Sequence, residues 1–574
     1  MTQIFKTVLL IFFTSTTNAQ NTYYVSPAGD DNNNGSFAQP WATPIKAGMT
    51  AEAGDTVYFM GGTYHTGLFC KNSGSEQEGY ITYSNYQNDT VIFDGAGVPN
   101  YNNEYNVWFE GFICNGDPNL TERASYIRIQ GIQIKNYQTW FGILMMGPSN
   151  HIEIRNCKVY DSDNLVAHGH AMIIFAQLGY QNGMNTGEMT NIVVDGNEIY
   201  NNNTGGNEQL TIYGEVNGFQ VTDNIVHDGT NICIDLIGRD SLNGEPFGRP
   251  VNGLVKGNIC YNSGQGSWGS GIYTDGAGRP GLPNSIVIEN NICYNNDFCG
   301  IEIGDEHGGE ISGGILVRNN IVYNNDYYGI WIGGGGSATP GEVQNVNVYN
   351  NTSYSNGYGE LAFGPCRNIV VKNNIFYGSP TGIYNIYVEG NNVDVNNSVD
   401  YNCWYPDRTF DWRGSEYTNF ADFKTATGQS QNGILADPLF SDATNHNFML
   451  QETSPCIDTG TPINAPTIDF DSITRPQGAG FDIGAYEYQQ ANEIKDNTIG
   501  NLMLYPNPTA EIIYTNPYLT GKTYQIFSST GKTVKQGTIN GNFIDISALK
   551  SGIYFLEIHL FNDETHTSKF IKKM

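Results

Sequence analysis

The stretch Asn-Asn-Ile-Cys-Tyr at 290–294 returns almost unchanged as Asn-Asn-Ile-Val-Tyr at 319–323 and Asn-Asn-Ile-Phe-Tyr at 373–377. Weaker copies precede and separate these three, and an asparagine holds the second place in every copy: Asn197, Asn224, Asn258, Asn291, Asn320, Asn351 and Asn374. Internal repeats of this length are typical of solenoid proteins. Because the repeats carry no helical period, we expect them to stack as the coils of a parallel β-helix.

A second phrase with the alternation of a β-strand lies between the copies. It reads Gly271-Ile-Tyr-Thr-Asp275, Gly300-Ile-Glu-Ile-Gly304 and Gly329-Ile-Trp-Ile-Gly333. Each coil therefore carries at least two short strands. We expect the recurring asparagines to form a ladder at one turn, where their amides satisfy backbone groups. The unequal spacing of the copies predicts loops inserted at the turns, and such loops usually build the binding surface of a solenoid.

The composition limits the classes of partner. The 574 residues carry a formal net charge of −30, which argues against nucleic acid because phosphates require a basic surface. A polyanionic substrate would need local arginines or a bound cation to offset this charge. The 69 glycines and the low charged fraction of 15% fit a turn-rich β protein with many buried positions.

Residues 1–19 have the pattern of a secretory signal peptide. Lys6 precedes the apolar run Val8–Phe13, and the small-residue stretch 17–19 resembles a cleavage site. The run is too short to span a bilayer, and no later segment is long enough either. The sequence thus predicts an exported, soluble and monomeric protein without a transmembrane segment.

Two of the ten cysteines stand at equivalent positions of neighbouring repeats. Cys260 and Cys293 occupy a place that is apolar in the other copies, so both should point into the core. Adjacent coils lie about 4.8 Å apart. This spacing permits either a stacked pair of buried thiols or a disulfide, and both readings stay open.

The first segment after the signal carries a family resemblance. It reads Tyr-Tyr-Val-Ser-Pro-Ala-Gly-Asp-Asp at 23–31 and Ala-Gly-Asp-Thr-Val-Tyr-Phe at 53–59. This opening is similar to that of exported bacterial right-handed parallel β-helix proteins of the pectate-lyase-like superfamily. The resemblance implies a β-helix over residues 20–400 with a helix that caps its N-terminal end. Members of the superfamily are mostly polysaccharide lyases, glycoside hydrolases and epimerases, with some adhesins.

Two further regions follow the repeats. Residues 401–488, with Asp-Ile-Gly-Ala-Tyr-Glu at 482–487, resemble the closing segment of such β-helices. A polar linker is predicted at 489–501. Residues 502–574, with Leu-Tyr-Pro-Asn-Pro-Thr at 504–509 and a basic end, resemble the sorting domain of Bacteroidetes type IX secretion cargo, a small β-sandwich. That resemblance implies the type IX secretion machinery as a partner and a secreted or cell-surface location.

Three acidic residues are predicted to meet on one outward face. Aligning the strand phrases places Asp235 directly opposite Asp275, about 5 Å away, with Glu302 one coil further and on the order of 8 Å from Asp275. Two carboxylates this close do not both ionise without help. Either one keeps a proton and serves as a general acid, or Asp235 and Asp275 hold Ca²⁺. A solvated acidic face is the structural alternative.

Other candidates surround these acids. Aromatic side chains beside them would stack on sugar rings, and polar residues in the loops that follow would line the site. His168 and His170, two residues apart, are a weaker candidate for metal binding. The candidate substrate-binding and loop residues are Tyr213, Tyr273, Trp331, Arg239, Glu306, Arg279 and His307.

Three functions fit these residues. A glycoside hydrolase would use Asp275 and Glu302 as acid and base and is the first choice. A lyase or epimerase would use Ca²⁺ at Asp235 and Asp275 with Arg279 or His307 as base. A non-catalytic carbohydrate-binding or adhesive protein would need the aromatics alone. The substrate is a polysaccharide in each case, and its sugar and linkage stay open, as does the stereochemistry.

Overall fold

The structure is a computed structural model. It describes residues 20–489 apart from 100, 103–106, 109–110, 117–122, 138, 164–168, 178–186, 243–244, 265, 267, 307–309, 335–340 and 391–395. Within the C-terminal region it describes 504, 509, 512–515, 519, 521–528, 531–539, 543–559 and 565–572. The predicted signal peptide and nearly all of the predicted linker lie outside the described residues.

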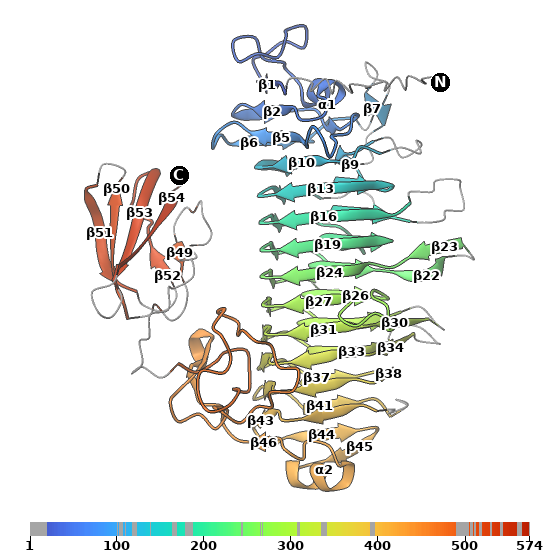
Figure 1. The fold of residues 1–574 in the computed structure, drawn as a ribbon, viewed down its shortest axis with the longest axis vertical. Coiled ribbons are helices and arrows are strands. Elements are labelled where there is room, and N and C mark those ends of the chain that lie inside the picture. Colours follow the sequence, from blue (N-terminus) through green and yellow to red (C-terminus); the bar gives the residue numbers. More distant parts are fainter. Residues whose placement is uncertain are drawn as a thin grey trace, which may run out of the picture.

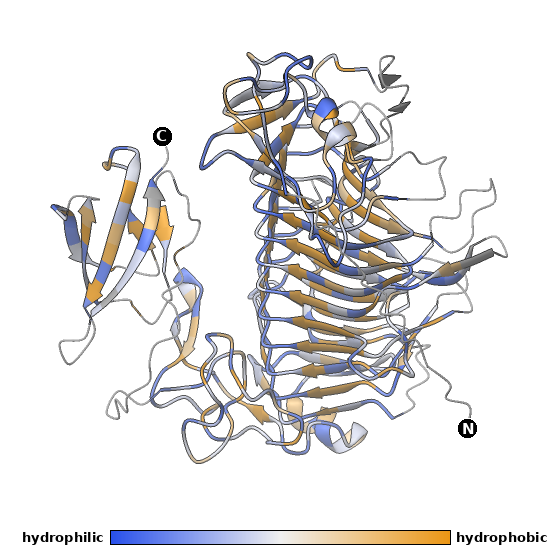
Figure 2. Cartoon of the chain, turned by 45° about the horizontal axis from the view of Figure 1, so that its top comes forward, coloured by the Kyte–Doolittle hydropathy of each residue, from blue (hydrophilic) through white to orange (hydrophobic). Residues whose placement is uncertain are grey.

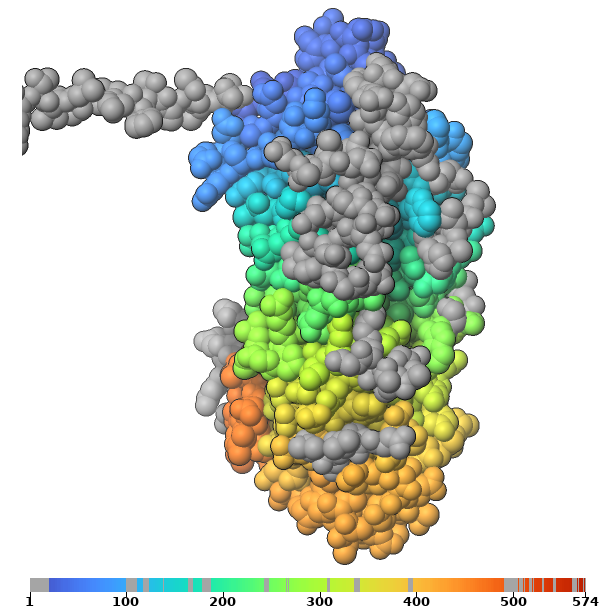
Figure 3. All heavy atoms as spheres, turned by 90° about the vertical axis from the view of Figure 1, so that its right-hand side faces the viewer, coloured from blue at the N-terminus to red at the C-terminus, as the bar shows by residue number. Residues whose placement is uncertain are grey.

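The described repeats form a solenoid with three long sheets, parallel except for the last strand of the third, and we call them sheets 1, 2 and 3 in the order in which the chain enters them in each coil. Figure 1 shows the strands stacked in chain order, and in Figure 3 the coils form successive bands from blue to orange. Each coil thus has a third strand besides the two that the phrases predicted.

Sheet 1 consists of β1 (Thr22–Val25), β2 (Thr56–Phe59), β5 (Ile81–Asn85), β10 (Ile127–Gln130), β13 (Ser149–Arg155), β16 (Met189–Asp195), β19 (Val216–Thr222), β24 (Val251–Lys256), β27 (Ile286–Glu289), β31 (Ile315–Arg318), β35 (Asn347–Tyr349), β39 (Val370–Lys372) and β42 (Ser398–Asp400). Sheet 2 consists of β3 (Gly62–Tyr64), β6 (Val91–Asp94), β11 (Ile132–Lys135), β14 (Lys158–Tyr160), β17 (Glu198–Tyr200), β20 (Ile225–His227), β25 (Ile259–Tyr261), β28 (Ile292–Tyr294), β32 (Ile321–Tyr323), β36 (Thr352–Tyr354), β40 (Ile375–Tyr377), β43 (Cys403–Tyr405) and β46 (Ile434–Leu435).

Sheet 3 consists of β4 (Leu68–Phe69), β9 (Gly111–Cys114), β12 (Phe141–Met146), β15 (His170–Ala176), β18 (Leu210–Gly214), β21 (Ile234–Ile237), β26 (Ile272–Asp275), β29 (Ile301–Asp305), β33 (Tyr328–Gly334), β37 (Gly359–Phe363), β41 (Tyr384–Val388), β44 (Thr409–Trp412) and β45 (Ser415–Tyr417). Smaller sheets in the described chain pair β7 (Tyr101–Asn102) with β8 (Val107–Trp108), β22 (Arg239–Leu242) with β23 (Glu245–Gly248), and β30 (Ile311–Gly313) with β34 (Glu342–Gln344) and β38 (Cys366–Arg367).

The predicted asparagine ladder is confirmed, and it lies at the turn between sheets 1 and 2. The Nδ2 of Asn258 donates to the Oδ1 of Asn291 at 2.9 Å, and Asn291 repeats this bond to Asn320. The Nδ2 of each also donates to a strand carbonyl, as in the bond from Asn291 to Val255 at 3.0 Å. The residue before each ladder asparagine has a positive φ, such as 56° at Asn290, which explains why that place holds Gly, Asn or Asp in most coils.

Apolar side chains fill the interior of the solenoid. Inward positions of the sheets are mostly Ile, Val or Leu, with Phe, Tyr, Met and Cys among them, and nearly all are fully buried. Figure 2 shows the strands largely in orange, joined by blue turns. Cys260 pairs with Cys293 in register, and all ten cysteines are buried and unbridged. The structure therefore favours the stacked thiols over the disulfide.

Helices close both ends of the solenoid, as predicted for the first end. Helix α1 (Pro44–Thr50) begins at the N-cap Thr43, whose side chain accepts a hydrogen bond from Lys46 N, and it buries Ile45 near β4. Helix α2 (Phe420–Thr427) stacks Phe423 on Phe410 at the other end. Because β43 and β46 still pair beyond residue 400, the coils end later than the predicted boundary.

The segment 436–488 does not cover the end of the solenoid but lies along its side (Figure 1). It contains β47 (Phe440–Asp442), the 3₁₀ helix η1 (Ala443–Asn445) and β48 (Asn447–Leu450). The positive-φ residues Asn290, Asn319 and Asn350 donate to its carbonyls at 2.7–2.9 Å. The turn between sheets 1 and 2 thus holds the segment 436–488 against the side of the solenoid.

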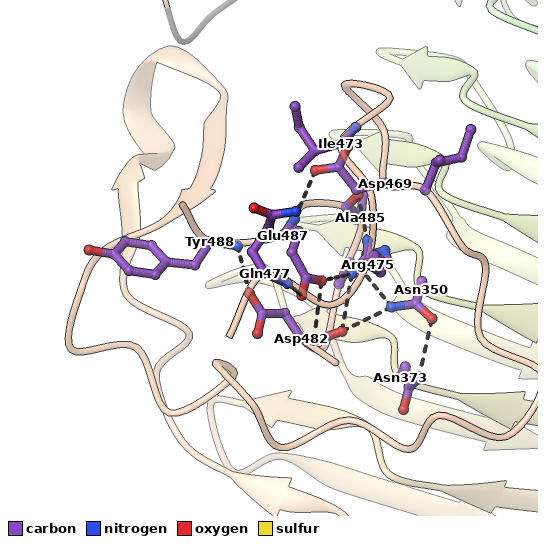
Figure 4. A network of polar contacts seen from close by, with 12 residues as sticks. Asn350, Asn373, Asp469, Ile473, Arg475, Gln477, Asp482, Ala485, Glu487 and Tyr488 are labelled. Carbon is purple, nitrogen blue, oxygen red and sulfur yellow. Dashed lines mark hydrogen bonds and ion pairs between the residues drawn. The ribbon is translucent and has the colours of Figure 1, made fainter. Parts of the chain in front are cut away.

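A buried arginine organises the last part of this segment (Figure 4). Arg475 pairs with Glu487 at 2.7 Å, and both side chains have no exposed surface. Arg475 Nη2 also donates to the carbonyls of Gly484 and Ala485 at 2.9 Å. A fully buried cation requires this many acceptors because its desolvation is costly.

The C-terminal region forms a separate β domain with its own apolar core around Ile526 and Leu556. Its described strands are β49 (Ile512–Tyr514) paired with β52 (Phe543–Asp545), and the sheet of β51 (Thr533–Thr538), β50 (Thr523–Ser528), β53 (Gly552–His559) and β54 (Thr565–Lys572). None of the helices in the described chain is long and apolar enough to cross a membrane.

Candidate active site

The outward face of sheet 3 carries the candidate acids. In register, Asp235 of β21 pairs with Tyr273 of β26, Tyr273 pairs with Glu302 of β29, and Glu302 pairs with Trp331 of β33. The neighbouring residues Ile234 and Leu236 are buried in the core, so Asp235 points outward with Tyr273 and Glu302. The three predicted acids therefore share one face of three successive coils.

The predicted contact between Asp235 and Asp275 is wrong in detail. Asp275 pairs with Ile237, so Asp235 lies one coil away and two residues along, on the order of 8 Å from Asp275. The prediction for Asp275 and Glu302 holds, because Asp275 pairs with Gly304, two residues beyond Glu302. Asp235 and Glu302 lie in the same column, about two coil spacings or 10 Å apart.

The error has a physical origin in the coil at 232–237. Ile232, Ile234 and Leu236 alternate, so this strand offers two registers that differ by two residues. A shift of two keeps every side chain on its own face, and alternation cannot distinguish the two choices. Moreover, Cys233 stands where later coils have the glycine that marks the start of the strand, as Gly271 does before Ile272.

Asp275 and Glu302 are half-buried and titrate near neutral pH. Burial, together with the negative charge of Glu306, raises the pKa of Asp275 to about 7. Burial likewise raises the pKa of Glu302 to about 7, although the Ser270 hydroxyl donates to its Oε2 at 2.6 Å. The Oδ1 of Asp275 accepts the backbone N–H of Glu306 at 3.1 Å.

The structure adds a fourth acid, the buried Glu208, that the sequence did not indicate. Glu208 precedes β18 by two residues, and burial followed by the charge of Asp275 raises its pKa to about 8. Its Oε2 lies 3.3 Å from Nδ1 of His170, and burial lowers the pKa of His170 to about 3. His170 also lies 2.8 Å from Thr211 Oγ1. Because Glu208 belongs to a loop without strand alternation, no periodic signal marks it.

The Ca²⁺ site predicted at Asp235 and Asp275 does not fit the described residues. Asp235 is 2% exposed, its Oδ1 has no hydrogen-bond partner, and burial followed by the charge of Glu208 raises its pKa well above the usual range. One orphaned oxygen is not a ligand set, and Asp275 lies two residues along the next coil. Within the described residues, no three His, Cys, Asp or Glu side chains are arranged to hold a metal ion.

The three predicted aromatic residues differ in their surroundings. Tyr213 packs between Phe175 and Phe247, with ring centroids 5.0 Å away on each side. Tyr273 is buried, and its hydroxyl donates to Glu306 Oε1 at 3.0 Å. Trp331 is half-buried next to Glu302 in the column. Of the three, Tyr273 alone lies between Asp235 and Glu302 in the column and donates a hydrogen bond to a further acid, Glu306.

The predicted loop residues are also separated by the structure. Arg239 is half-buried, acts to lower the pKa of Asp275 and lies over the Phe247 ring at 5.2 Å. Arg279 is exposed and pairs with Glu215 at 3.2 Å, a carboxylate outside the cluster. His168 and His307 lie outside the described residues.

The sequence placed Arg249 only in a loop beside the site, whereas in the structure it follows hairpin β22–β23 and is buried. Its guanidinium donates to Asp240 at 2.9 Å, to Glu310 at 2.8 Å and to the carbonyl of Gly276. Gly276 directly follows Asp275. Arg249 therefore connects the end of β26, where Asp275 lies, to hairpin β22–β23. The dipeptide Arg249-Pro250 indicates only that this part of the chain is a loop.

Comparison with known sequences identifies the fold family. The sequence model described as "Pel9A-like, right handed beta helix region" matches residues 23–332, more than half of the 574-residue chain. The chain belongs to the Pel9A-like right-handed β-helix family. Residues 503–573 match the secretion system C-terminal sorting domain, so this family member is a type IX secretion cargo that is secreted or held at the cell surface.

One sequence relative and two solved structures illustrate what this Pel9A-like chain is similar to. The uncharacterized protein YwoF of Bacillus subtilis (strain 168) is 30% identical over 452 residues, 75% of this chain and 91% of YwoF. The crystal structure of pectate lyase Pel9A has 16% identity and a TM-score of 0.41, with 83% of this chain and 98% of Pel9A covered. The GH136 lacto-N-biosidase from Eubacterium ramulus has 12% identity and a TM-score of 0.38, with 66% and 68% covered. Neither structural likeness is strong enough to transfer an activity.

Proposed function

We propose that this Pel9A-like protein is an exported glycoside hydrolase that cleaves a polysaccharide with Asp275 and Glu302. The observation that carries the proposal is the pair of half-buried carboxyls on neighbouring coils, each with a pKa raised to about 7. At neutral pH such a pair holds both a protonated and an ionised carboxyl. Hydrolysis requires that combination of acid and base.

The two carboxyls differ in ways that suggest their roles. Asp275 accepts a backbone N–H and lies near Arg239, and both interactions favour its ionised form. We assign it as the base that activates water. The Ser270 hydroxyl also favours the ionised form of Glu302, but no arginine acts on its pKa and burial outweighs this one bond, so we assign Glu302 as the acid that protonates the leaving oxygen. A separation on the order of 8 Å fits inversion, in which water enters between the two groups.

A polysaccharide lyase is the second candidate. Membership in the Pel9A-like family supports it, and so does the Arg239 cation beside Asp275, which would offset a uronate carboxylate. In that reaction Asp275 would remove the proton next to the carboxyl group, a C=C bond would form as the glycosidic C–O bond breaks, and Glu302 would protonate the leaving oxygen, so no water-derived hydroxyl would form.

One assay separates these candidates. The purified protein is incubated with a panel of neutral and acidic polysaccharides, with and without EDTA. New reducing ends without the ultraviolet absorbance of unsaturated sugars support hydrolysis, whereas that absorbance supports a lyase. Neither product across the panel contradicts both proposals.

Substitutions then connect the activity to the site. Glu302→Gln and Asp275→Asn keep the side-chain volume and should each abolish cleavage with an unchanged far-UV circular dichroism spectrum. Glu198→Gln is the matched control, because Glu198 lies on sheet 2 and pairs with Lys158 there. Full activity of Glu302→Gln would remove that residue from the mechanism.

A further inference from the structure

Trp268 is the most exposed large apolar side chain recorded for the described residues. Its indole is 71% exposed, although it stands in the turn between β25 and β26, beside the candidate site. Its ring centroid lies 4.8 Å from that of Phe298, and the two ring planes are 72° apart. At this exposure at least one face of the indole is open to solvent.

A stack of rings supports this indole from the coils that follow. Phe298 stacks on Tyr327 with a centroid distance of 4.8 Å, and Tyr327 stacks on Tyr358 at 4.9 Å. The faces of these three rings are therefore in contact with one another. Trp268 makes an edge contact with Phe298 at the end of the stack and is not itself stacked face to face.

Another aromatic row of the molecule provides a comparison. Tyr261, Tyr294 and Tyr323 stack in the same way along sheet 2, and the closing segment covers the end of this row with His446, 4.3 Å from the Tyr323 ring. No such covering contact is recorded for Trp268 among the described residues. Leaving a large indole in water forgoes the free energy of its burial, which is characteristic of a surface that binds a partner.

The Trp268 turn is fixed directly to the acid Glu302. Ser270, two residues after Trp268, donates its hydroxyl to Glu302 Oε2 at 2.6 Å. In addition, Phe298 N–H donates to the carbonyl of Gly269 at 3.1 Å. The turn that carries the indole is therefore hydrogen-bonded both to the Glu302 carboxyl and to the coil of Phe298, which places Trp268 at the edge of the site.

We propose that Trp268 is the stacking platform of a sugar subsite next to Glu302, and that this subsite takes a glycan without carboxylate groups. This inference rests on the hydrolase proposed above. An indole face binds the apolar C–H face of a pyranose ring, and the ring hydroxyls remain free for polar groups.

Charge decides the class of glycan. Five acidic side chains act on one another across the site, namely Glu208, Asp235, Asp275, Glu302 and Glu306. The cation that acts on the Asp275 pKa is Arg239, and the whole chain has a formal net charge of −30. A row of uronate carboxylates would lie beside the ionised members of this cluster or force them to take up further protons, a cost that one arginine does not offset, so a neutral glycan is favoured.

Binding is measured in the Glu302→Gln protein, which holds substrate without cleaving it under the proposed mechanism. Neutral and uronate oligosaccharides of equal length are titrated by calorimetry and by intrinsic tryptophan fluorescence. We expect neutral oligosaccharides to bind and to change the fluorescence. Trp268→Ala in this background should weaken that binding about tenfold, and Trp268→Phe should weaken it less.

Phe37→Ala is the control, because Phe37 is also exposed (58%) but packs on Tyr24 near the N-terminal end of the solenoid. Its affinity should equal that of the parent. Equal affinity of Trp268→Ala and its parent, tighter binding of uronates, or no binding at all would overturn the inference. Binding that depends on Trp268 without any cleavage by the unsubstituted protein would uphold the subsite and contradict the hydrolase.

Discussion

Asp275 and Glu302 give the activity a defined pH dependence at the scale of single residues. Both pKa values are raised to about 7, so the base loses its charge below this pH and the acid loses its proton above it. Because the charge of Asp275 contributes to the raised pKa of Glu302, the two titration steps belong to both groups together. We expect kcat/KM to peak near pH 7 and to fall on both sides. A rate that is constant between about pH 5 and 9 would contradict the assignment.

Arg475 is a single residue on which the closing segment depends. Replacing it with Met leaves the Glu487 carboxylate buried without its partner, which should lower the free energy of unfolding by about 3–5 kcal/mol. Chemical denaturation followed by circular dichroism measures the change. Arg367→Met is the control, because its ion pair with Glu342 is partly exposed and its loss should cost less than about 1 kcal/mol.

At the scale of one element, the asparagine ladder should be sensitive at each step. Asn291→Ala removes the acceptor of the Asn258 backbone N–H and side-chain amide, and it leaves the Val255 carbonyl without that donor. Since each unsatisfied buried group costs about 1–3 kcal/mol, we expect a loss of at least about 3 kcal/mol in denaturation. Asn295→Gly keeps a positive-φ position on an exposed turn and should change stability by less than about 0.5 kcal/mol.

A second polar row ends in a buried acid and predicts a pH-dependent stability. Asn296, Asn325 and Asn356 repeat the amide bonds of the ladder, and Asn356 Nδ2 donates to Glu360 Oε2 at 2.7 Å. Burial raises the pKa of Glu360 to about 7 from 4.5. The folded chain holds this proton more tightly, so the stabilisation is complete below pH 4.5 and declines as the pH rises through about 7.

Glu360→Gln should remove this component. The difference in unfolding free energy between the variant and the parent should therefore grow from pH 4.5 to about 7 in favour of Gln. Comparison by difference is necessary because Asp275 and Glu302 titrate in the same direction. A difference that stays constant over this interval would show that Glu360 does not titrate there.

At the scale of the whole molecule, the solenoid and the sorting domain have separate apolar cores. The solenoid core runs from Val25 to Phe423, and the sorting-domain core is formed by residues from Ile513 to Phe570. A chain that ends at residue 489 should thus keep the thermal unfolding midpoint of the solenoid. Calorimetry of both chains tests this, and a midpoint lowered by many degrees would indicate that the sorting domain stabilises the solenoid.

The sequence predicted those parts of the molecule that repeat. Period-two alternation placed Tyr273 and Glu302 in one column, and the recurrent asparagine predicted the ladder, because both patterns reflect contacts between equivalent positions. Asp235 was placed two residues out of register because its strand alternates equally well in both registers. Glu208, Arg249 and Trp268 lie in turns. The contacts of a turn differ from one coil to the next, so no repeating sequence pattern predicts these residues.

The turn between sheets 1 and 2 has two residues in every coil from Gly196–Asn197 to Tyr401–Asn402, whereas the connections around sheet 3 vary widely in length. Insertions and deletions on that side leave the stacking of the coils unchanged. Hairpin β22–β23 and the Trp268 turn can therefore each be replaced separately, in natural variants or by engineering. Ligand preference can diverge in this way while the folding of the scaffold is conserved.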